Sequence, residues 1–238
     1  MPGLVPGIHV LIFPATKTWM AGTSPAMTEG NIQSASRDRR ADASLAPANA
    51  IQTGGHRMTR IAIIDRADMN AEQARVYDAA KATSGIVSGP YYAYIRLPKV
   101  FEASQHLRAA LASGPLSRRE HQIVNLAVAR HWNARYPWHA QVRNSLAVGI
   151  EQPVIDAINA RKTPSLTDAR ERTCFAVAKE ILADKGLSDA SYAAAEKTMG
   201  VESLVALIGA IGAFSMTCIT AATFQIDPPA DDPVPLAG

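Results

Sequence analysis

The stretch RREHQIVNLAVARHWNARYPWHAQVRNSLAVG, residues 118–149, decides the fold that we predict for this chain. Its apolar residues recur at helical spacing, and no part of it alternates apolar and polar residues as a half-buried strand would. Ser117 stands before the first periodic residue as an N-cap, and Pro137 suits the first position of a new helix. The stretch therefore predicts two helices, over 118–132 and 137–149, joined by a short polar corner.

The same helical signals recur on both sides of this stretch. Asn70, with Gln73 three residues later, has the spacing of a reciprocal N-cap. A loop is expected over 85–98. Further helices are expected over 71–83, 99–112, 153–160, 167–184, 189–199 and 201–224. Because no segment shows sustained period-2 alternation, we predict an all-α fold.

Residues 1–57 differ from the rest of the chain. They are rich in Pro, Gly, Ser and Thr and show no sustained periodicity, which is typical of a disordered segment. Met58 opens a sequence that looks like a true beginning. We therefore expect residues 1–57 to be a disordered leader that is not native, and residues 58–238 to form one helical domain. A targeting or regulatory arm is the alternative interpretation of the leader.

Composition narrows the classes of function. The chain has 238 residues, 47% of them hydrophobic, and a net charge of +3 with Lys and Arg mixed among Asp and Glu. Because no basic stripe is interleaved with aromatic residues, we expect no nucleic-acid partner. The N-terminal apolar stretch has no positive flank and is broken by prolines, which argues against a secretion signal. Cys174 and Cys218 form no Cys-x-x-Cys motif and are typical of buried thiols in the cytoplasm, where we place the protein.

Residues 203–224 form a segment without any charged side chain. The segment is long enough to cross a bilayer. No aromatic or basic anchors flank it, however, and a helix that is apolar on all sides equally suits a domain core or a subunit contact. We therefore predict a buried helix and no membrane partner.

Polar and aromatic side chains gather on the two helices that flank the corner. Gln122 and Asn125 lie near one face of the first helix, and Trp138 and Gln141 share a face of the second. If the two helices pack as an antiparallel hairpin, Gln122 approaches Gln141 over a cleft walled by Trp138 and Tyr136. The histidines of this region lack the spacing that a zinc site favours, so we expect no metal.

The run over 119–150, with SGPYYAYIRLPKVFE before it and FQIDPP after it, resembles the carboxymuconolactone decarboxylase family. The resemblance covers roughly residues 85–229. It implies the all-helical fold that this family shares with alkylhydroperoxidase D, and a homotrimer or homohexamer. It also implies a small carboxylated lactone, or a related acid from aromatic-compound breakdown, as the substrate, with no cofactor.

The chain departs from the family at the residues that carry its chemistry. The position of the family's usual Glu is Gln122, and that of its usual His is Gln141. The two cysteines of the peroxidase branch would fall at Ala134 and Pro137. Thiol peroxidase activity is therefore excluded for lack of a nucleophile at the site. A glutamine exchanges hydrogen bonds but transfers no proton near neutral pH, so the usual acid–base pair is missing too.

Two hypotheses follow for the function. In the first, the chain is an active carboxy-lyase whose acid has moved to His139, with Arg130 and Arg143 holding a carboxylate. The other expected site residues orient the substrate or line its pocket: Gln122, Gln141, His131, Tyr136 and Trp138. In the second, the chain is a catalytically degenerate protein that binds a small acid or only assembles.

Each site residue also has a structural interpretation. His131 closes a helix end, where a cationic imidazole is favoured. Tyr136 and Trp138 serve as buried hydrophobic residues. Gln122 and Gln141 form a mutually satisfied buried pair with no ligand. The sequence leaves these alternatives open.

Overall fold

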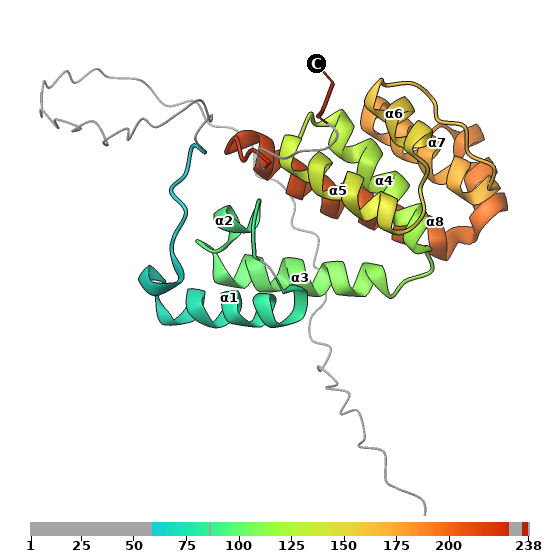
Figure 1. Cartoon of the computed structure of the whole chain (residues 1–238). Helices are drawn as coiled ribbons and strands as arrows, with labels where there is room; N and C mark the ends of the chain where they lie inside the picture. The colour runs from blue at the N-terminus through green and yellow to red at the C-terminus, as the bar shows by residue number, and fades with distance from the viewer. Residues whose placement is uncertain (1–58, 86, 229–234, 238) are drawn as a thin grey trace, which may run out of the picture. The chain divides into compact units, whose positions relative to one another are not determined.

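Helices make up the regular structure of the chain (Figure 1). The computed structural model describes residues 59–85, 87–228 and 235–237, which all belong to one unit over 52–238. The expectation for residues 1–57 lies outside the described residues. The elements are a 3-10 turn η1 (Arg66–Asp68), α1 (Ala71–Ser84), α2 (Tyr91–Tyr94), α3 (Pro98–Ala112), α4 (Arg118–His131), α5 (Arg135–Ala147), α6 (Gln152–Asn159), α7 (Ala169–Asp184) and α8 (Asp189–Thr223). No strand occurs in these ranges, so the predicted all-α class is confirmed.

Local capping chemistry fixes where the helices begin. The reciprocal N-cap predicted for Asn70 and Gln73 is present at α1. At α4, Ser117 Oγ accepts from the Glu120 backbone at 3.1 Å, and Glu120 Oε2 accepts from the Ser117 backbone at 2.7 Å. At α7 the N-cap is Asp168, one residue later than predicted, because its carboxylate accepts two backbone N–H groups. Those bonds hold the pKa of Asp168 below its usual range.

Two differences from the prediction lie around the proline-containing segments. Helix α5 begins at Arg135, so that Pro137 is its third residue rather than its first. This costs the helix no hydrogen bond, because the first four N–H groups of a helix have no intrahelical acceptor. The short helix α2 lies inside the segment 85–98 that was predicted to be a loop, and four residues are too few to give a periodic signal.

Helix α8 consists of two helical stretches that meet at Gly200. The backbone of Gly200 has φ 78° and ψ 160°, a conformation that glycine alone adopts without strain, and the break falls where the sequence predicted it. By length and composition α8 is apolar enough to cross a membrane, yet only 33% of its most apolar window is buried. Within the described chain other helices cover one side of α8, and the predicted alternative of a subunit contact for the other side stays a prediction.

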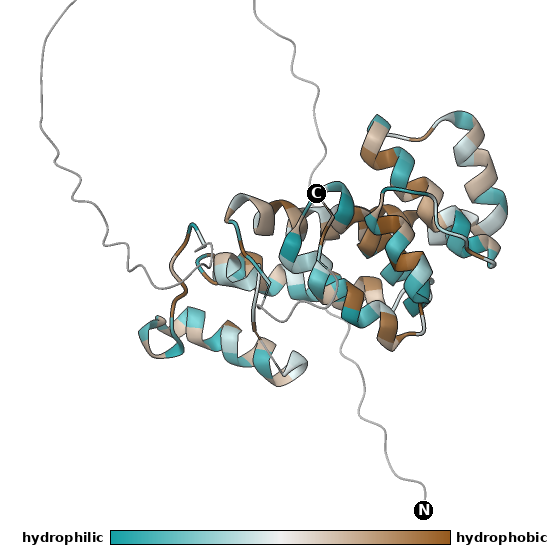
Figure 2. Cartoon of the chain, turned by 45° about the horizontal axis from the view of Figure 1, so that its top comes forward, coloured by the Kyte–Doolittle hydropathy of each residue, from teal (hydrophilic) through white to brown (hydrophobic). Residues whose placement is uncertain are grey.

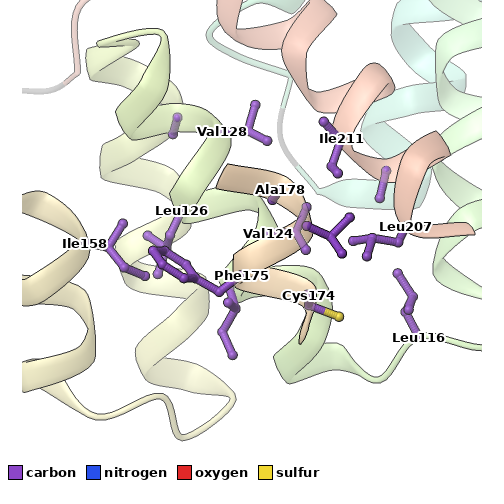
Figure 3. Packing of buried hydrophobic residues seen from close by; sticks show 14 of the residues in the cluster. Leu116, Val124, Leu126, Val128, Ile158, Cys174, Phe175, Ala178, Leu207 and Ile211 are labelled. Atoms are coloured by element: carbon purple, nitrogen blue, oxygen red, sulfur yellow. The ribbon is translucent and has the colours of Figure 1, made fainter. Parts of the chain in front are cut away.

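The core surrounds α4, which packs against α5, α7 and α8 (Figure 1). Hydrophilic and hydrophobic residues alternate along most of the helices, as Figure 2 shows. The apolar faces meet at buried side chains: Val124 of α4 lies near Leu207 of α8, and Leu126 of α4 lies beside Phe175 of α7 and Ile158 of α6 (Figure 3). Burial of this apolar surface is the main stabilising contribution.

A second, smaller cluster joins α1, α2 and α3. Its members include Val76, Tyr94 and Phe101, and Phe101 is fully buried. The hydroxyl of Tyr94 is 3.1 Å from Thr220 Oγ1, which links this cluster to the end of α8. The N-terminal helices are thus attached to the core through α8.

Two ion pairs connect the N-terminal turns of α4 and α7 in a reciprocal way. Arg119 of α4 donates to Glu171 of α7 at 2.7 Å, and Arg170 of α7 donates to Glu120 of α4 at 2.7 Å. Both carboxylates are buried, and the Arg170 side chain is 34% exposed. The two helices therefore begin side by side, at the end of α4 opposite the polar corner.

The end of the chain is held at α6 by one residue. The side chain of Asn159 donates to the carbonyl of Pro235 at 3.0 Å and accepts from the backbone of Ala237 at 2.9 Å. Leu236, which lies between these two residues, packs against the main core. The backbone carbonyl of Asn159 also accepts from Arg130 Nε at 2.6 Å, so the chain end, α6 and α4 meet at this point.

Candidate functional site

The candidate site is the seam between α4 and α5 together with the corner that joins them. The corner turns at Asn133, whose φ of 48° is left-handed, and the backbone of Ala134 donates to Ala129 at 3.0 Å. Asparagine tolerates this conformation better than most residues. The tight turn makes α4 and α5 antiparallel neighbours, which is the condition under which the sequence placed Gln122 near Gln141, and they lie side by side in Figure 1.

A pair of amides connects the two helices halfway along the seam. Asn125 Nδ2 donates to Gln141 Oε1 at 3.3 Å, and both side chains are partly buried. The mutually satisfied pair of Gln122 and Gln141 that the sequence allowed is not formed, because Gln122 Oε1 is shielded from solvent and accepts no hydrogen bond. Gln141, which stands at the position of the family's usual histidine, is therefore held by Asn125.

A second unsatisfied oxygen lies close by along the seam. Ser145 is fully buried, and its Oγ has no hydrogen-bond partner. Ser145 follows Gln141 by one helical turn, and Gln122 precedes Asn125 by about one turn. Because the helices are antiparallel, both steps lead in the same direction, so Gln122 and Ser145 reach the same level of the seam. Two buried oxygens with unmet hydrogen-bonding capacity are uncommon and require an explanation.

The N-terminal turn of α5 carries the aromatic part of the site. The hydroxyl of Tyr136 is 2.5 Å from Ser88 Oγ. Gly89 has φ 66°, and a Cβ there would overlap the Tyr136 ring, so this glycine allows the ring to lie against the backbone. The ring centroid of His139 is 6.5 Å from that of Tyr136, and His139 is only 4% exposed.

Nearby tyrosines share this environment. Burial raises the pKa of Tyr92, and its neighbours Tyr136 and Tyr77 act in the same direction. The sequence placed Ser88 and Gly89 only in a predicted loop. The SGP step at 88–90 was a turn signal, but nothing in it indicated a contact with α5.

The two arginines expected to hold a carboxylate are separated. Arg143 is exposed on the surface of α5. Arg130 is 4% exposed, and it donates to the carbonyl of Asn159 and to Asn133 Oδ1. Burial, together with the charge of Arg161, lowers the pKa of Arg130. These contacts give Arg130 a structural role, because they connect α4 to α6 and to the corner.

The remaining expected residues occupy contrasting environments. His131 is exposed at the end of α4, with its ring edge-on to Trp132 at a centroid distance of 5.1 Å. Partial desolvation of its ring and the charge of Arg161 lower the pKa of His131, which disfavours the cationic form suggested for a helix end. Trp138 is fully buried within the main core. Arg135 binds Asp227 of its own chain at 3.2 Å.

No sulfur is present where the peroxidase branch has its cysteines. Ala134 and Pro137 occupy those positions, and both are buried at the corner. Cys174 and Cys218 are fully buried in the main core instead. Burial raises the pKa of Cys174 to about 12, and it also raises the pKa of Cys218. Neither thiol is positioned to act as a thiolate nucleophile.

The described residues offer little for a site elsewhere in the fold. No group of three His, Cys, Asp or Glu side chains is arranged to hold a metal there. An open hollow of about 560 Å³ lies at the other end of α4, where its lining includes Glu120, Arg170 and Ser203. In that hollow Glu120 pairs with Arg170, and Glu171 pairs with Arg119, so these charges already have partners and we place the candidate site in the seam.

Comparisons with known proteins agree with this architecture. No family model matches the sequence, and no curated protein matches it. Solved structures of other proteins share the fold. An uncharacterised peroxidase-related protein from Ralstonia eutropha, described as an alkylhydroperoxidase AhpD core, has a TM-score of 0.63 at 18% identity and covers 76% of this chain and 100% of its own. A peroxidase-related protein from Silicibacter also has a TM-score of 0.63 at 18% identity, over 78% and 99%.

The third structure is a protein of unknown function from Agrobacterium tumefaciens, a candidate AhpD antioxidant defence protein. It has a TM-score of 0.53 at 20% identity, over 62% of this chain and 99% of its own. These likenesses show the class of fold: the chain has an alkylhydroperoxidase D-like helical fold. At the positions that the resemblance assigned to the reactive residues, this chain has the amides Gln122 and Gln141 and the buried residues Ala134 and Pro137.

Proposed function

We propose that this protein binds a small hydroxylated or carboxylated organic molecule in the α4–α5 seam and uses no thiol chemistry there. The observation that carries the proposal is the pair of buried oxygens, Gln122 Oε1 and Ser145 Oγ, that lack hydrogen-bond partners beside the Asn125–Gln141 amide pair. A buried acceptor without a donor is costly, and a ligand hydroxyl or a bound water supplies that donor.

The chemistry of the seam defines the class of ligand. Gln122 Oε1 requires a donor such as a hydroxyl, whereas an amide NH₂ or the Ser145 hydroxyl donates to a carbonyl or carboxylate oxygen. Hydroxy acids and carboxylated lactones of the kind that the family resemblance implies carry one or both functions. Their charge is also matched by the exposed cation Arg143 on α5.

The test separates binding from stability. Gln122→Met removes the unsatisfied acceptor at similar size, so the folded protein is expected to remain as stable as the parent or to gain stability. The same variant is expected to lose binding of hydroxy acids and carboxylated lactones in thermal-shift and calorimetric titrations. Asn144→Ala, at an exposed position of α5, is the matched control and is expected to bind as the parent does.

Two results would contradict the proposal. The first is unchanged binding by Gln122→Met. The second is a large loss of its stability, because that loss would show that Gln122 already has a partner in the free protein.

A second candidate function is decarboxylation with His139 as the acid. The observation in its favour is that His139 is a titratable group enclosed at the corner, with its ring against Tyr136. In this reaction the bond between the carboxylate and the ring carbon breaks and carbon dioxide leaves. The electron pair stays on the carbon next to the lactone carbonyl, and His139 delivers a proton to that carbon.

Turnover distinguishes the two candidates. If decarboxylation occurs, His139→Gln is expected to abolish the absorbance change of the substrate while leaving its binding in place. Binding without any turnover by the parent protein would eliminate decarboxylation and leave the binding function alone.

A further inference from the structure

Two guanidinium groups share one oxygen atom at the corner between α4 and α5. Arg130 of α4 and Arg161, which follows α6, both donate to Oδ1 of Asn133, and the contact from Arg161 Nη2 is 2.9 Å long. Lys162 comes next in the chain and is exposed. We call Arg130, Arg161 and Lys162 the cationic cluster. Like charges repel one another at such short separations, so two guanidiniums held on one neutral oxygen require an explanation.

No carboxylate in the described part of the chain is paired with the cationic cluster. Asp227, which follows α8, binds Arg135 at 3.2 Å. Asp156 of α6 accepts a hydrogen bond from a glutamine one turn earlier at 2.8 Å. Burial lowers the pKa of Arg130, and the charge of Arg161 lowers that pKa further. The corner therefore carries positive charge that its own acids leave uncompensated.

The ends of two helices offset only part of this charge. Helices α4 and α6 end at the corner, at His131 and Asn159, and Arg130 Nε donates to the carbonyl of Asn159 at 2.6 Å. The C-terminus of a helix carries about half a negative charge, so the two ends together offset about one of the positive charges of the cluster. About two positive charges remain, and a phosphate monoester carries nearly the same charge of opposite sign at neutral pH.

The backbone is strained on both sides of the shared oxygen. Asn133 has φ 48° and Arg161 has φ 59°, so both residues that meet in this hydrogen bond are left-handed. Asparagine tolerates that conformation, whereas arginine adopts it at a cost that glycine would avoid. Strain of this kind is found where a side chain is needed at a fixed place. The turn after α6 therefore points to a task for the guanidinium of Arg161.

The corner presents hydrogen-bond donors around Asn133. Because its Oδ1 accepts from two guanidiniums, the NH₂ group of the same amide is left to donate elsewhere. Arg161 and Lys162 are exposed and carry further N–H donors. Arg130 is 4% exposed and held by two acceptors, so its charge is fixed in place. An arginine fork and a lysine ammonium group at one place are typical of phosphate recognition.

From these observations we propose that the corner binds a phosphate group, either inorganic phosphate or the phosphate of a small monoester. Arg161 and Lys162 contact the phosphate oxygens, the NH₂ group of Asn133 donates to another, and Arg130 supplies charge from the interior. A carboxylate carries a single charge, so it is expected to bind less tightly. Gln122 lies eight residues before Arg130, about 12 Å along α4, so the inference is independent of what the α4–α5 seam binds.

Calorimetric titration of the full chain with inorganic phosphate tests the proposal. Arg161→Asn removes the guanidinium and places a residue that tolerates the left-handed backbone, so the variant is expected to stay folded. Its affinity for phosphate is expected to fall at least about tenfold, because it loses hydrogen bonds to a charged group. Arg118→Gln removes a charge at an exposed position at the other end of α4 and is expected to bind phosphate as the parent does.

A second variant and two further ligands complete the test. Lys162→Gln leaves both contacts of Asn133 in place and is expected to weaken phosphate binding about threefold, since it removes one exposed charge. Acetate at the same ionic strength is expected to bind at least about tenfold more weakly than phosphate. Glycerol 2-phosphate distinguishes the two sources: tighter binding than inorganic phosphate assigns the site to a monoester, and weaker binding assigns it to free phosphate.

Three results would overturn the inference. One is a parent protein whose Kd for both phosphate ligands lies above about 20 mM, which is weaker than a specific site requires. Another is unchanged phosphate affinity in both Arg161→Asn and Lys162→Gln. The third is acetate binding as tight as phosphate binding, which would indicate a general attraction of anions to a positive surface.

Discussion

Removing the charge of Glu120 tests the reciprocal ion pairs between α4 and α7. Glu120→Gln keeps a side-chain oxygen for the backbone of Ser117, because glutamine also serves in this kind of helix cap. The variant loses the charged partner of Arg170, which now donates to Glu120 Oε1 at 2.7 Å. A hydrogen bond to a charged group contributes about 1.5–3 kcal/mol, and Arg170 is one-third exposed, so we expect a loss of about 2 kcal/mol. For a domain of this size, that loss lowers Tm by roughly 4–8 °C.

A double-mutant cycle isolates the interaction from other effects. The free energy of unfolding is measured by denaturant titration for Glu120→Gln, Arg170→Met and the double variant. The coupling between the two residues is expected to be about 1–2 kcal/mol. Asp78→Asn, in the exposed pair with Arg66, is the control and is expected to have a much smaller effect. A coupling energy near zero for Glu120 and Arg170 would refute the argument that burial makes this pair strong.

Three further predictions concern the corner and the thiols. Gly89→Ala is expected to cost at least about 2 kcal/mol, because it combines a left-handed backbone with overlap of the Tyr136 ring, and less in a Tyr136→Ala background. Cys174 and Cys218 are expected to resist thiol reagents at pH 8 until the protein is unfolded, because burial keeps them protonated; rapid labelling of the folded protein would disprove this. The pKa of His131 is lowered in the folded state, so the unfolded chain binds its proton more tightly and stability falls as pH drops through about 6.5. Denaturant titrations at pH 7.5 and 5.5 should show that His131→Gln reduces this fall.

The fold followed from the sequence where local chemistry decides it. The caps at Asn70 and Ser117 lie within one turn of the helices that they begin, so their spacing is visible in the sequence. The sequence left open how α8 is buried, because charge-free composition does not distinguish a helix covered on all sides by its own chain from one covered on one side. The short α2 was missed for a related reason, since a single turn depends on packing of Tyr94 rather than on a periodic pattern.

The candidate site was predictable in position but not in pairing. Helical periodicity placed Gln122 and Gln141 on facing helices, yet the level at which each side chain lies depends on how α4 and α5 slide past each other. Asn125 consequently became the partner of Gln141. Arg130 seemed free to bind an anion because its acceptor, the carbonyl of Asn159, is 29 residues away in sequence. Such long-range contacts leave no local signal.

The contact of Asn159 with the end of the chain makes the corner sensitive to proteolytic trimming. Removing residues 235–237 would take away both partners of the Asn159 side chain, and Asn159 in turn orients Arg130 against Asn133. A trimmed protein would keep its helices while the amides around residues 130–134 exchange faster with solvent. Preparations that differ only in a nicked C-terminus would therefore differ at the candidate site, and intact mass is the property to check before two batches are compared.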